Sequence, residues 1–294
     1  MNLTAESTLD VQSQLGEGPV WFKEALWFVD IELGELHRFR PSTLEHARYS
    51  AGQRISFAVP ASDGSWIVGL EGGLAFWRVG EGQPEVFANP ESDLPRNRFN
   101  DGKCDPSGRL YGGTMRNDGA AGHGALYRVD DDLVVRKTVS NVSISNGLAW
   151  DLELERMYYN DTKTCRTDVF DWCPATGELS NRQTLYQFDE TEGVPDGMCF
   201  DVESRLWVAM WGGSRVVAID VNLGRQVGKI AVEATQVTSC CFGGPGRNEL
   251  FITTARVGLD GEALSWYPKA GNVFRAEMDT AGHPCDVFKG RQSH

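Results

Sequence analysis

The chain has 294 residues, of which 41% are hydrophobic and 33 are glycine, and its formal net charge is −13. Such an acidic chain without a lysine or arginine cluster repels polyphosphate, so we expect no nucleic-acid partner. No stretch approaches the ~20 apolar residues that a membrane-spanning helix needs, and the first residues lack the basic start and apolar run of a signal peptide. These properties predict a cytoplasmic protein without a membrane partner.

A short strand-like phrase recurs six times in the same phase along the chain. Its copies lie about 40 to 49 residues apart, which is the period of propeller blades. They read ALWFVD (25–30), SWIVGL (65–70), RLYGGT (109–114), RMYYND (156–161), RLWVAM (205–210) and ELFITT (249–254). Turn residues separate runs rich in Val, Ile, Phe, Trp and Tyr, and helical periodicity is nearly absent. We therefore predict an all-β fold, a six-bladed β-propeller with four antiparallel strands per blade, with residues 1–294 as a single domain.

Two segments outside the repeat carry structural expectations. The segment 7–13 is strand-like and precedes the first blade, so we expect it to pair with a strand of the last blade and close the ring, which removes exposed strand edges. The segment 115–124 is the most loop-like of the chain and is expected at the mouth of the central channel.

A second phrase precedes each repeat by about ten residues and, in four of six copies, carries an oxygen-bearing side chain beside Gly or Pro. These four residues are Glu17, Asn100, Asn146 and Asp196. In a propeller the innermost strand of each blade lines the channel, so the starts of these strands converge at one end. Two carboxylates with carboxamide oxygens suit one divalent metal ion, Ca²⁺ first, with Mg²⁺, Mn²⁺, Zn²⁺ or Fe²⁺ also accommodated.

Simpler interpretations exist for several polar residues. Asn146 and Asp196 each precede Gly, an ordinary hairpin signal, and only their place in the repeat favours a metal role. Asp101 also precedes Gly and is interpreted as structural. His123 is interpreted as a solvent-exposed loop residue, and Trp211 as packing, with sugar stacking as the alternative. The seven cysteines form no CxxC pair and are expected to be reduced and mostly buried.

Several long motifs make the chain resemble the senescence marker protein/regucalcin/gluconolactonase family. In chain order, from about Leu15 to Phe274, they are LGEGPVW, NRFNDGKCDPSGR, GGTM, SNGLAW, PDGMCFD, LWVAMWGG and TSCCFGG. The resemblance implies a six-bladed propeller that binds one divalent metal in its channel and hydrolyses sugar lactones. It thus implies a small-molecule sugar lactone as partner, and we expect a monomer or weak oligomer.

The resemblance also implies roles for individual residues. Glu17, Asn146 and Asp196 match the family's metal ligands, and Asp196 also matches the proposed general base. Arg98 and Asn100 match substrate-contacting residues, with Asn100 also near the metal through water. Animal members place an acidic residue after GGTM that contacts the sugar hydroxyls. Here the sequence at that point is ArgAsnAspGly, so Asp118 is the nearest candidate and the choice of substrate is open.

The sequence leaves two reaction mechanisms and three functions open. Either Asp196 takes the proton from the attacking water, or a hydroxide on the metal attacks, and the residues do not separate the two. The leading hypothesis is a gluconolactonase-like hydrolase that opens aldonolactones to the acid. The alternative is a calcium-binding regulatory protein without turnover. Phosphotriester hydrolysis is a third hypothesis, as a side activity of the same electrophilic site.

Overall fold

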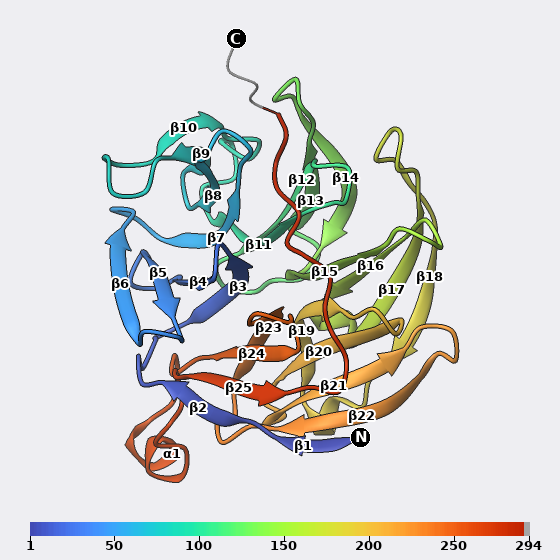
Figure 1. Cartoon of the computed structure of the whole chain (residues 1–294). Coiled ribbons are helices and arrows are strands. Elements are labelled where there is room, and N and C mark those ends of the chain that lie inside the picture. The colour runs from blue at the N-terminus through green and yellow to red at the C-terminus, as the bar shows by residue number, and fades with distance from the viewer. Residues whose placement is uncertain (291–294) are drawn as a thin grey trace.

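The computed structural model describes residues 1–290 and confirms the predicted propeller: six sheets stand around a central axis (Figure 1). Each blade begins at the channel with its innermost strand, and these six strands contact one another in order around the ring, the last contacting the first. They are β3 (Gly16–Phe22), β7 (Ile55–Pro60), β11 (Asn97–Cys104), β15 (Ser145–Asp151), β19 (Val194–Phe200) and β23 (Val237–Gly243).

The remaining strands of each blade follow outward in chain order as antiparallel neighbours. The repeated sequence phrase forms the second strands, which are β4 (Ala25–Asp30), β8 (Trp66–Leu70), β12 (Leu110–Arg116), β16 (Arg156–Asp161), β20 (Arg205–Trp211) and β24 (Glu249–Thr254). The third strands are β5 (Glu35–Arg40), β9 (Gly73–Trp77), β13 (Gly124–Val129), β17 (Arg166–Trp172), β21 (Arg215–Asp220) and β25 (Val273–Glu277). The outer strands of the first five blades are β6 (Glu45–Ser50), β10 (Glu85–Ala88), β14 (Val135–Val142), β18 (Leu179–Gln187) and β22 (Arg225–Ala231).

The N-terminal segment closes the ring. Strand β2 (Glu6–Leu9) pairs antiparallel with β25, so the sixth blade is built from both ends of the chain. This confirms the predicted closure for residues 7–9, whereas residues 10–13 lead into β3. An additional strand, β1 (Asn2–Thr4), pairs parallel with β22 and covers the outer edge of the fifth blade.

Helical structure is confined to three short elements in residues 1–290. They are the 3-10 turns η1 (Thr162–Thr164) and η2 (Glu190–Glu192) and the helix α1 (Gly261–Trp266). None of the described helices is long and apolar enough to cross a membrane. The predicted loop at 115–124 is observed at 117–123, between β12 and β13.

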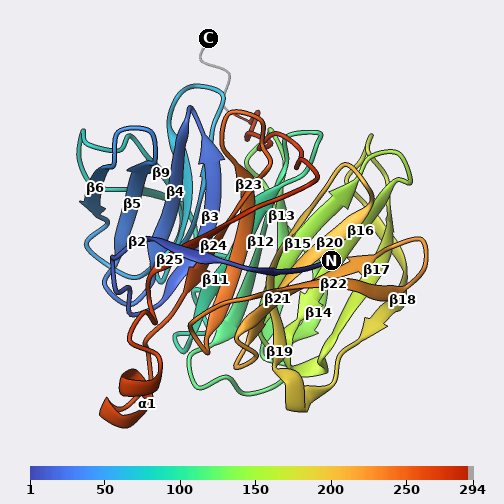
Figure 2. The ribbon, with the colours of Figure 1, turned by 60° about the horizontal axis from the view of Figure 1, so that its bottom comes forward.

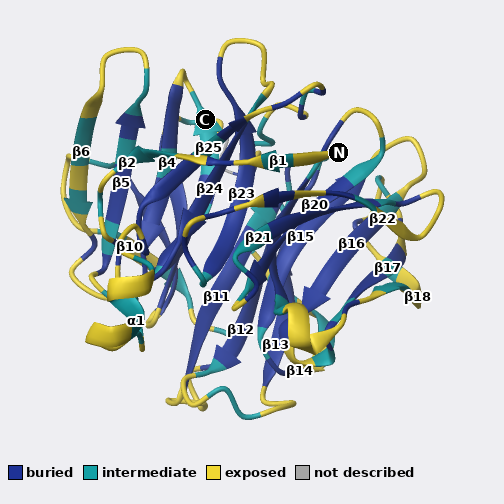
Figure 3. Cartoon of the chain, turned by 90° about the horizontal axis from the view of Figure 1, so that it is seen from below, coloured by how far each residue is buried: buried dark blue, intermediate teal, exposed yellow. Residues whose placement is uncertain are grey.

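Burial follows the radial order of the strands, with buried inner strands and exposed outer strands and loops (Figure 3). Close apolar packing surrounds Phe57 on β7, which is fully buried. Three glycines from the second and third blades lie against its ring, where an added Cβ would approach ring atoms to 2.3 Å at Gly69, 2.6 Å at Gly102 and 3.1 Å at Gly112. These positions accept only glycine without movement of Phe57, so the aromatic ring and the glycines form one packing unit.

We expect Phe57→Ala to lower the free energy of unfolding by about 3–5 kcal/mol, because it removes a fully buried ring and leaves a cavity walled by glycines that cannot fill it. Urea denaturation followed by circular dichroism measures this. Leu223→Ala, at a side chain that is 57% exposed, serves as the control and is expected to change stability by less than about 0.5 kcal/mol. Equal effects of the two substitutions would contradict this account of the core.

Candidate functional site

All six inner strands lose their regular pairing near the start. The register shifts fall between Glu17 and Val20, Ile55 and Phe57, Phe99 and Gly102, Asn146 and Leu148, Pro195 and Met198, and Val237 and Ser239. A β-bulge bends its strand and re-aims a side chain. The four residues singled out in the repeat therefore lie in or beside bulges at equivalent places of four blades, which is why they converge.

Three buried carboxyl groups share this end of the channel. Glu17 on β3, Asp101 on β11 and Asp196 on β19 are 6%, 7% and 4% exposed. Glu17 accepts a hydrogen bond from the Gly18 amide (2.9 Å), and Asp101 accepts one from the Gly102 amide (2.7 Å). Glu17 and Asp101 thus each accept one hydrogen bond from the amide of the following glycine.

The electrostatics of these acids follow from their burial. Desolvation, and then the Asp101 charge, raises the pKa of Glu17 to about 8. Desolvation, and then the charges of Glu17 and Asp101, raises the pKa of Asp196 well above its ordinary value. The pKa of Asp101 is also raised by desolvation, although the Lys103 ammonium opposes the shift. Like charges in a low-dielectric channel disfavour ionisation, so these acids favour protons or a bound cation.

A chain of side-chain hydrogen bonds joins the third and fourth blades beside these acids. Arg98 Nη1 donates to Asn100 Oδ1 (2.8 Å), and Asn100 Nδ2 donates to Asn146 Oδ1 (3.2 Å) and to the Ser145 carbonyl (2.9 Å). Asn146 Nδ2 in turn donates to Thr162 Oγ1 (2.8 Å). This network fixes the orientation of the Asn146 amide and leaves one lone pair of its oxygen free.

One polar atom of this site has no partner. Asp196 Oδ1 is fully buried and accepts no hydrogen bond from any described residue. A buried carboxylate oxygen left unpaired is costly, and a cation would satisfy it. Within residues 1–290, no three His, Cys, Asp or Glu side chains are grouped so as to hold a metal ion by themselves. A metal here would accordingly need the Asn146 amide oxygen beside the carboxylates of Glu17 and Asp196, a hard-oxygen set that fits such an ion.

Arg98 is the buried cation of this end of the channel. Its side chain donates from Nη1 to the Phe99 carbonyl and to Asn100, both at 2.8 Å. Burial lowers the pKa of its guanidinium to about 10, so it remains charged at neutral pH. The Nε and Nη2 atoms of Arg98 donate no hydrogen bond to a described residue. This part of the guanidinium group can therefore donate to a ligand.

Asp118 is placed differently from the other predicted site residues. It lies in the exposed loop between β12 and β13, and both carboxylate oxygens accept from Arg116, at 2.7 and 2.6 Å. This pairing holds the pKa of Asp118 below its usual range. No described contact joins it to Glu17, Asn146 or Asp196, so its role as a substrate contact stays a prediction. In the same loop, His123 is exposed and its ring faces Arg116 (3.2 Å).

Two residues of the site were not anticipated. The structural interpretation of Asp101 stays a prediction, but the bulge between Phe99 and Gly102 places Asp101 beside Asn100 in the buried site. The Asn-Asp-Gly sequence at 100–102 is the sequence feature that could have indicated this bulge. A bulge lets two successive side chains face the same side. Thr162 lies in the turn η1, outside the repeated phrase, and its bond to Asn146 could not be inferred from the repeat.

The site lies at one end of the channel. Strand β24 ends at Thr254 opposite the first residue of β23, and the following segment leads to α1, so α1 flanks the end at which the inner strands begin (Figure 2). The C-terminal segment lies at the other end and crosses the middle of the ring in Figure 1. The channel therefore has one end that carries the acidic site and another end that the C-terminal segment crosses.

The fold and this polar channel end define a class of six-bladed propellers with a single buried acidic site on the axis. The model of the SMP-30/Gluconolactonase/LRE-like region matches residues 15–256, and the chain belongs to this family.

Three similar proteins span nearly the whole chain. Regucalcin of Pongo abelii is 36% identical over 283 residues, which cover 93% of this chain and 94% of the relative. A Bacillus subtilis (strain 168) protein, provisionally named as a sugar lactone lactonase, is 36% identical over 283 residues and covers 96% and 97%. The solved structure of a calcium-binding protein, regucalcin, from Agrobacterium tumefaciens superposes with a TM-score of 0.93 at 27% identity, over 98% of this chain and 99% of that one.

The metal-free protein is expected to lose stability as the pH rises from about 4.5 to about 8. The pKa of Glu17 is raised in the folded state, so the folded chain binds more protons than the unfolded chain in this window. Stability from this group is therefore complete below its unfolded pKa and falls by at most about 1.4 kcal/mol per pH unit towards its folded pKa. Urea denaturation in chelator at several pH values measures the slope.

The substitution Glu17→Gln isolates this contribution, because it removes the titrating group and keeps its size. We expect a shallower dependence of stability on pH than in the wild type. Glu85→Gln, at an exposed position of β10, is the matched control and should keep the wild-type slope. An unchanged slope in Glu17→Gln would show that Glu17 does not titrate as described.

Proposed function

We propose that the protein is a metal-dependent hydrolase that opens sugar (aldono-) lactones, such as gluconolactone, to the aldonic acid. The observation that carries the proposal is the unpartnered, buried Oδ1 of Asp196 beside Glu17 and the oriented Asn146 amide. Family membership and the name of the Bacillus subtilis relative support a lactone hydrolase.

The metal would be held by Glu17, Asn146 and Asp196, with water completing its coordination. Carboxylate and amide oxygens favour Ca²⁺ and also accept Mg²⁺ or Mn²⁺, while Zn²⁺ and Fe²⁺ are tolerated. When bound, such an ion supplies a Lewis acid that stabilises the negative charge developing on the lactone carbonyl oxygen. Because the acids are buried and their pKa values raised, the ion replaces protons that the channel otherwise retains.

In the proposed reaction, Asp196 is the general base. Water adds through its oxygen to the carbonyl carbon while an Asp196 oxygen accepts a water proton. The bond between the carbonyl carbon and the ring oxygen then breaks, and the same proton passes to the departing ring oxygen to give a hydroxyl. A base that is buried and held by the β19 backbone is positioned for both transfers, and positioned proton transfer contributes about 10²–10⁴-fold to such rates.

Arg98 and Asn100 would orient the sugar ring. The unpaired part of the Arg98 guanidinium can donate to lactone hydroxyls, and burial strengthens such bonds. Asn100 donates through its amide to Asn146 and accepts from Arg98, so it also couples the substrate-binding cation to the metal-binding amide. Asp118 would add a contact from the β12–β13 loop.

A calcium-binding protein without turnover is the second candidate. The description of the Agrobacterium tumefaciens structure as a calcium-binding protein favours it. Both candidates use the same oxygen donors, so turnover of a lactone is the measurement that separates them.

We expect Asp196→Ala to reduce lactone hydrolysis by at least about 10²-fold, because the variant lacks the proton acceptor and one metal-binding carboxylate. Acid release from gluconolactone in a pH-stat assay measures this, with circular dichroism to verify folding. The control is Asp10→Ala, at an exposed position, which should retain wild-type rates. A folded Asp196→Ala variant with near-normal turnover would contradict the assignment.

Removal of divalent ions is expected to abolish the hydrolysis and to lower the melting temperature, because the three acids then repel one another without a cation. Each of Ca²⁺, Mg²⁺, Mn²⁺ and Zn²⁺ is added back to the chelated protein, and both rate and melting temperature are recorded. Restored melting temperature without restored hydrolysis of gluconolactone, xylonolactone, arabinonolactone or galactonolactone would support the calcium-binding candidate. Full activity after chelation would contradict metal dependence.

A further inference from the structure

A cavity of about 830 Å³ occupies the end of the channel opposite the acidic site. Inner strands of all six blades line it with residues from their later halves, among them Trp21, Val59, Lys103, Trp150, Phe200 and Phe242. None of Glu17, Arg98, Asn146 or Asp196 contributes to its lining. The channel therefore has two chemically different ends, and this volume is in the range of small-molecule sites.

The C-terminal segment crosses this cavity and is fastened on both sides of it. On one side Gly282 donates to the Arg247 carbonyl (2.8 Å) and forms a bridge with Asp201. On the other side Phe288, which is fully buried, forms a bridge with Ala61 and donates to the Pro60 carbonyl (2.9 Å). Residues 283–286 lie between these anchors and line the cavity, so its partial cover is held in place by main-chain bonds.

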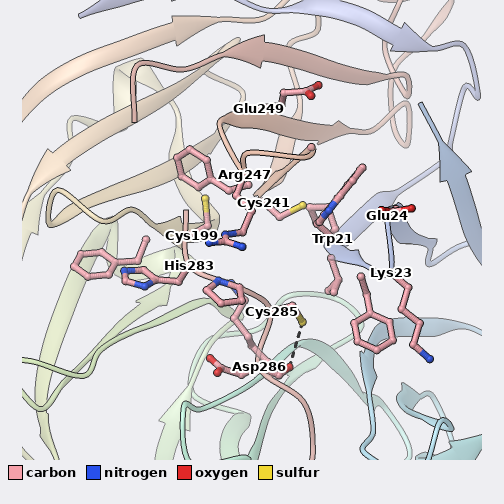
Figure 4. A pocket seen from close by; sticks show the side chains of 18 of the residues that line it. Trp21, Lys23, Glu24, Cys199, Cys241, Arg247, Glu249, His283, Cys285 and Asp286 are labelled. Atoms are coloured by element: carbon pink, nitrogen blue, oxygen red, sulfur yellow. Dashed lines mark hydrogen bonds between the residues drawn. The ribbon is translucent and has the colours of Figure 1, made fainter. Parts of the chain in front are cut away.

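The walls of the cavity are apolar and aromatic. Trp21 stacks on Phe251 with ring centroids 5.3 Å apart, and Phe200 stacks on His283 at 5.9 Å. Figure 4 shows Trp21, Cys199, Cys241 and Cys285 around the cavity. Burial raises the pKa of these three thiols, so they are protonated and act as small apolar groups. Flat aromatic walls that are themselves fixed by stacking favour a flat apolar ligand.

Among the charged residues of the lining, Lys103 lies on an inner strand of the channel. Lys103 reaches across the channel from β11 on the third blade and donates to the Met198 carbonyl of the fifth blade (2.7 Å). It forms no ion pair with a described residue, whereas Arg275 in the same lining is paired with Glu249 at 2.9 Å. An ammonium has three donors, so Lys103 retains two for a ligand.

The charge of the lining differs in sign from that of the chain. The lining contains four cations and three acids, a surplus of one positive charge in a chain of net charge −13: Lys23, Lys103, Arg247 and Arg275, and Glu24, Glu249 and Asp286. Arg247, whose Nε donates to the Gly282 carbonyl (3.1 Å), points into the cavity in Figure 4. Local cations with free donors attract an anionic group, even on an acidic protein.

From these observations we propose that this end of the channel is a second binding site, for a flat aromatic carboxylate. The ring system lies among Trp21, Phe200 and Phe242, and the carboxylate accepts hydrogen bonds from Lys103. The site is separate from the proposed lactone site and does not depend on it, because the two share no residue.

The test compares 2-naphthoate with 2-naphthamide, which has the same ring and shape but no charge, by isothermal titration calorimetry on the full chain. We expect one molecule of 2-naphthoate per chain and at least about tenfold weaker binding of 2-naphthamide, because the amide loses the charge-assisted bond to Lys103. Equal binding of both compounds, or binding of neither, would overturn the proposal.

The substitution Lys103→Met removes the ammonium and keeps an unbranched side chain that is one atom shorter. It should weaken 2-naphthoate at least about tenfold while 2-naphthamide binds as before, which also verifies that the cavity is intact. Lys229→Met, at an exposed position of β22, is the matched control and should bind both compounds like the wild type. Unchanged 2-naphthoate affinity in Lys103→Met, or an equal loss in Lys229→Met, would overturn the proposal.

Discussion

The burial of three carboxyl groups at one end of a narrow channel is the constraint on which the site depends. Glu17, Asp101 and Asp196 come from three different blades, and desolvation is the largest cause of the raised pKa of each; the Asp101 charge further raises the pKa values of Glu17 and Asp196, and the Glu17 charge raises that of Asp196. Such an arrangement costs folding free energy, and it is tolerable only where protons or a cation compensate it. The propeller holds the three carboxyl groups together because each is fixed on a different inner strand. None of them can move away without disturbing a bulge.

The surrounding polar network makes this arrangement rigid. Asn100 bonds across from the third blade to the fourth, Asn160 Nδ2 donates to the Asp196 carbonyl of the fifth (2.7 Å), and Thr238 Oγ1 donates from the sixth blade to the Gly16 carbonyl of the first (2.6 Å). These bonds join neighbouring blades at the level of the acids. Preorganised polar groups of this kind lower the cost of reorganisation during a reaction, which is the main contribution a protein makes to electrostatic catalysis.

Lys103 connects the two ends of the channel electrostatically. Desolvation raises the pKa values of Asp101 on one side and of Asp286 on the other, and the Lys103 ammonium opposes both shifts, although it forms an ion pair with neither. Asp286 belongs to the C-terminal segment that covers the cavity. An anion bound at Lys103 would therefore change the electrostatic potential at both ends, although the proposed lactone site and the proposed aromatic carboxylate site share no residue.

The sequence by itself determined the number of blades, the pairing of the second strands and the convergence of Glu17, Asn100, Asn146 and Asp196, because a periodic pattern specifies equivalent positions in a closed ring. It also indicated the N-terminal closure by residues 7–9. Only the tertiary structure decided that Asp101 joins the site, that Thr162 orients Asn146, and that Asp118 is paired with Arg116 in an exposed loop. The bulges, the turn η1 and the crossing of the C-terminal segment depend on contacts between residues far apart in the chain, and a repeat pattern carries no information about such contacts.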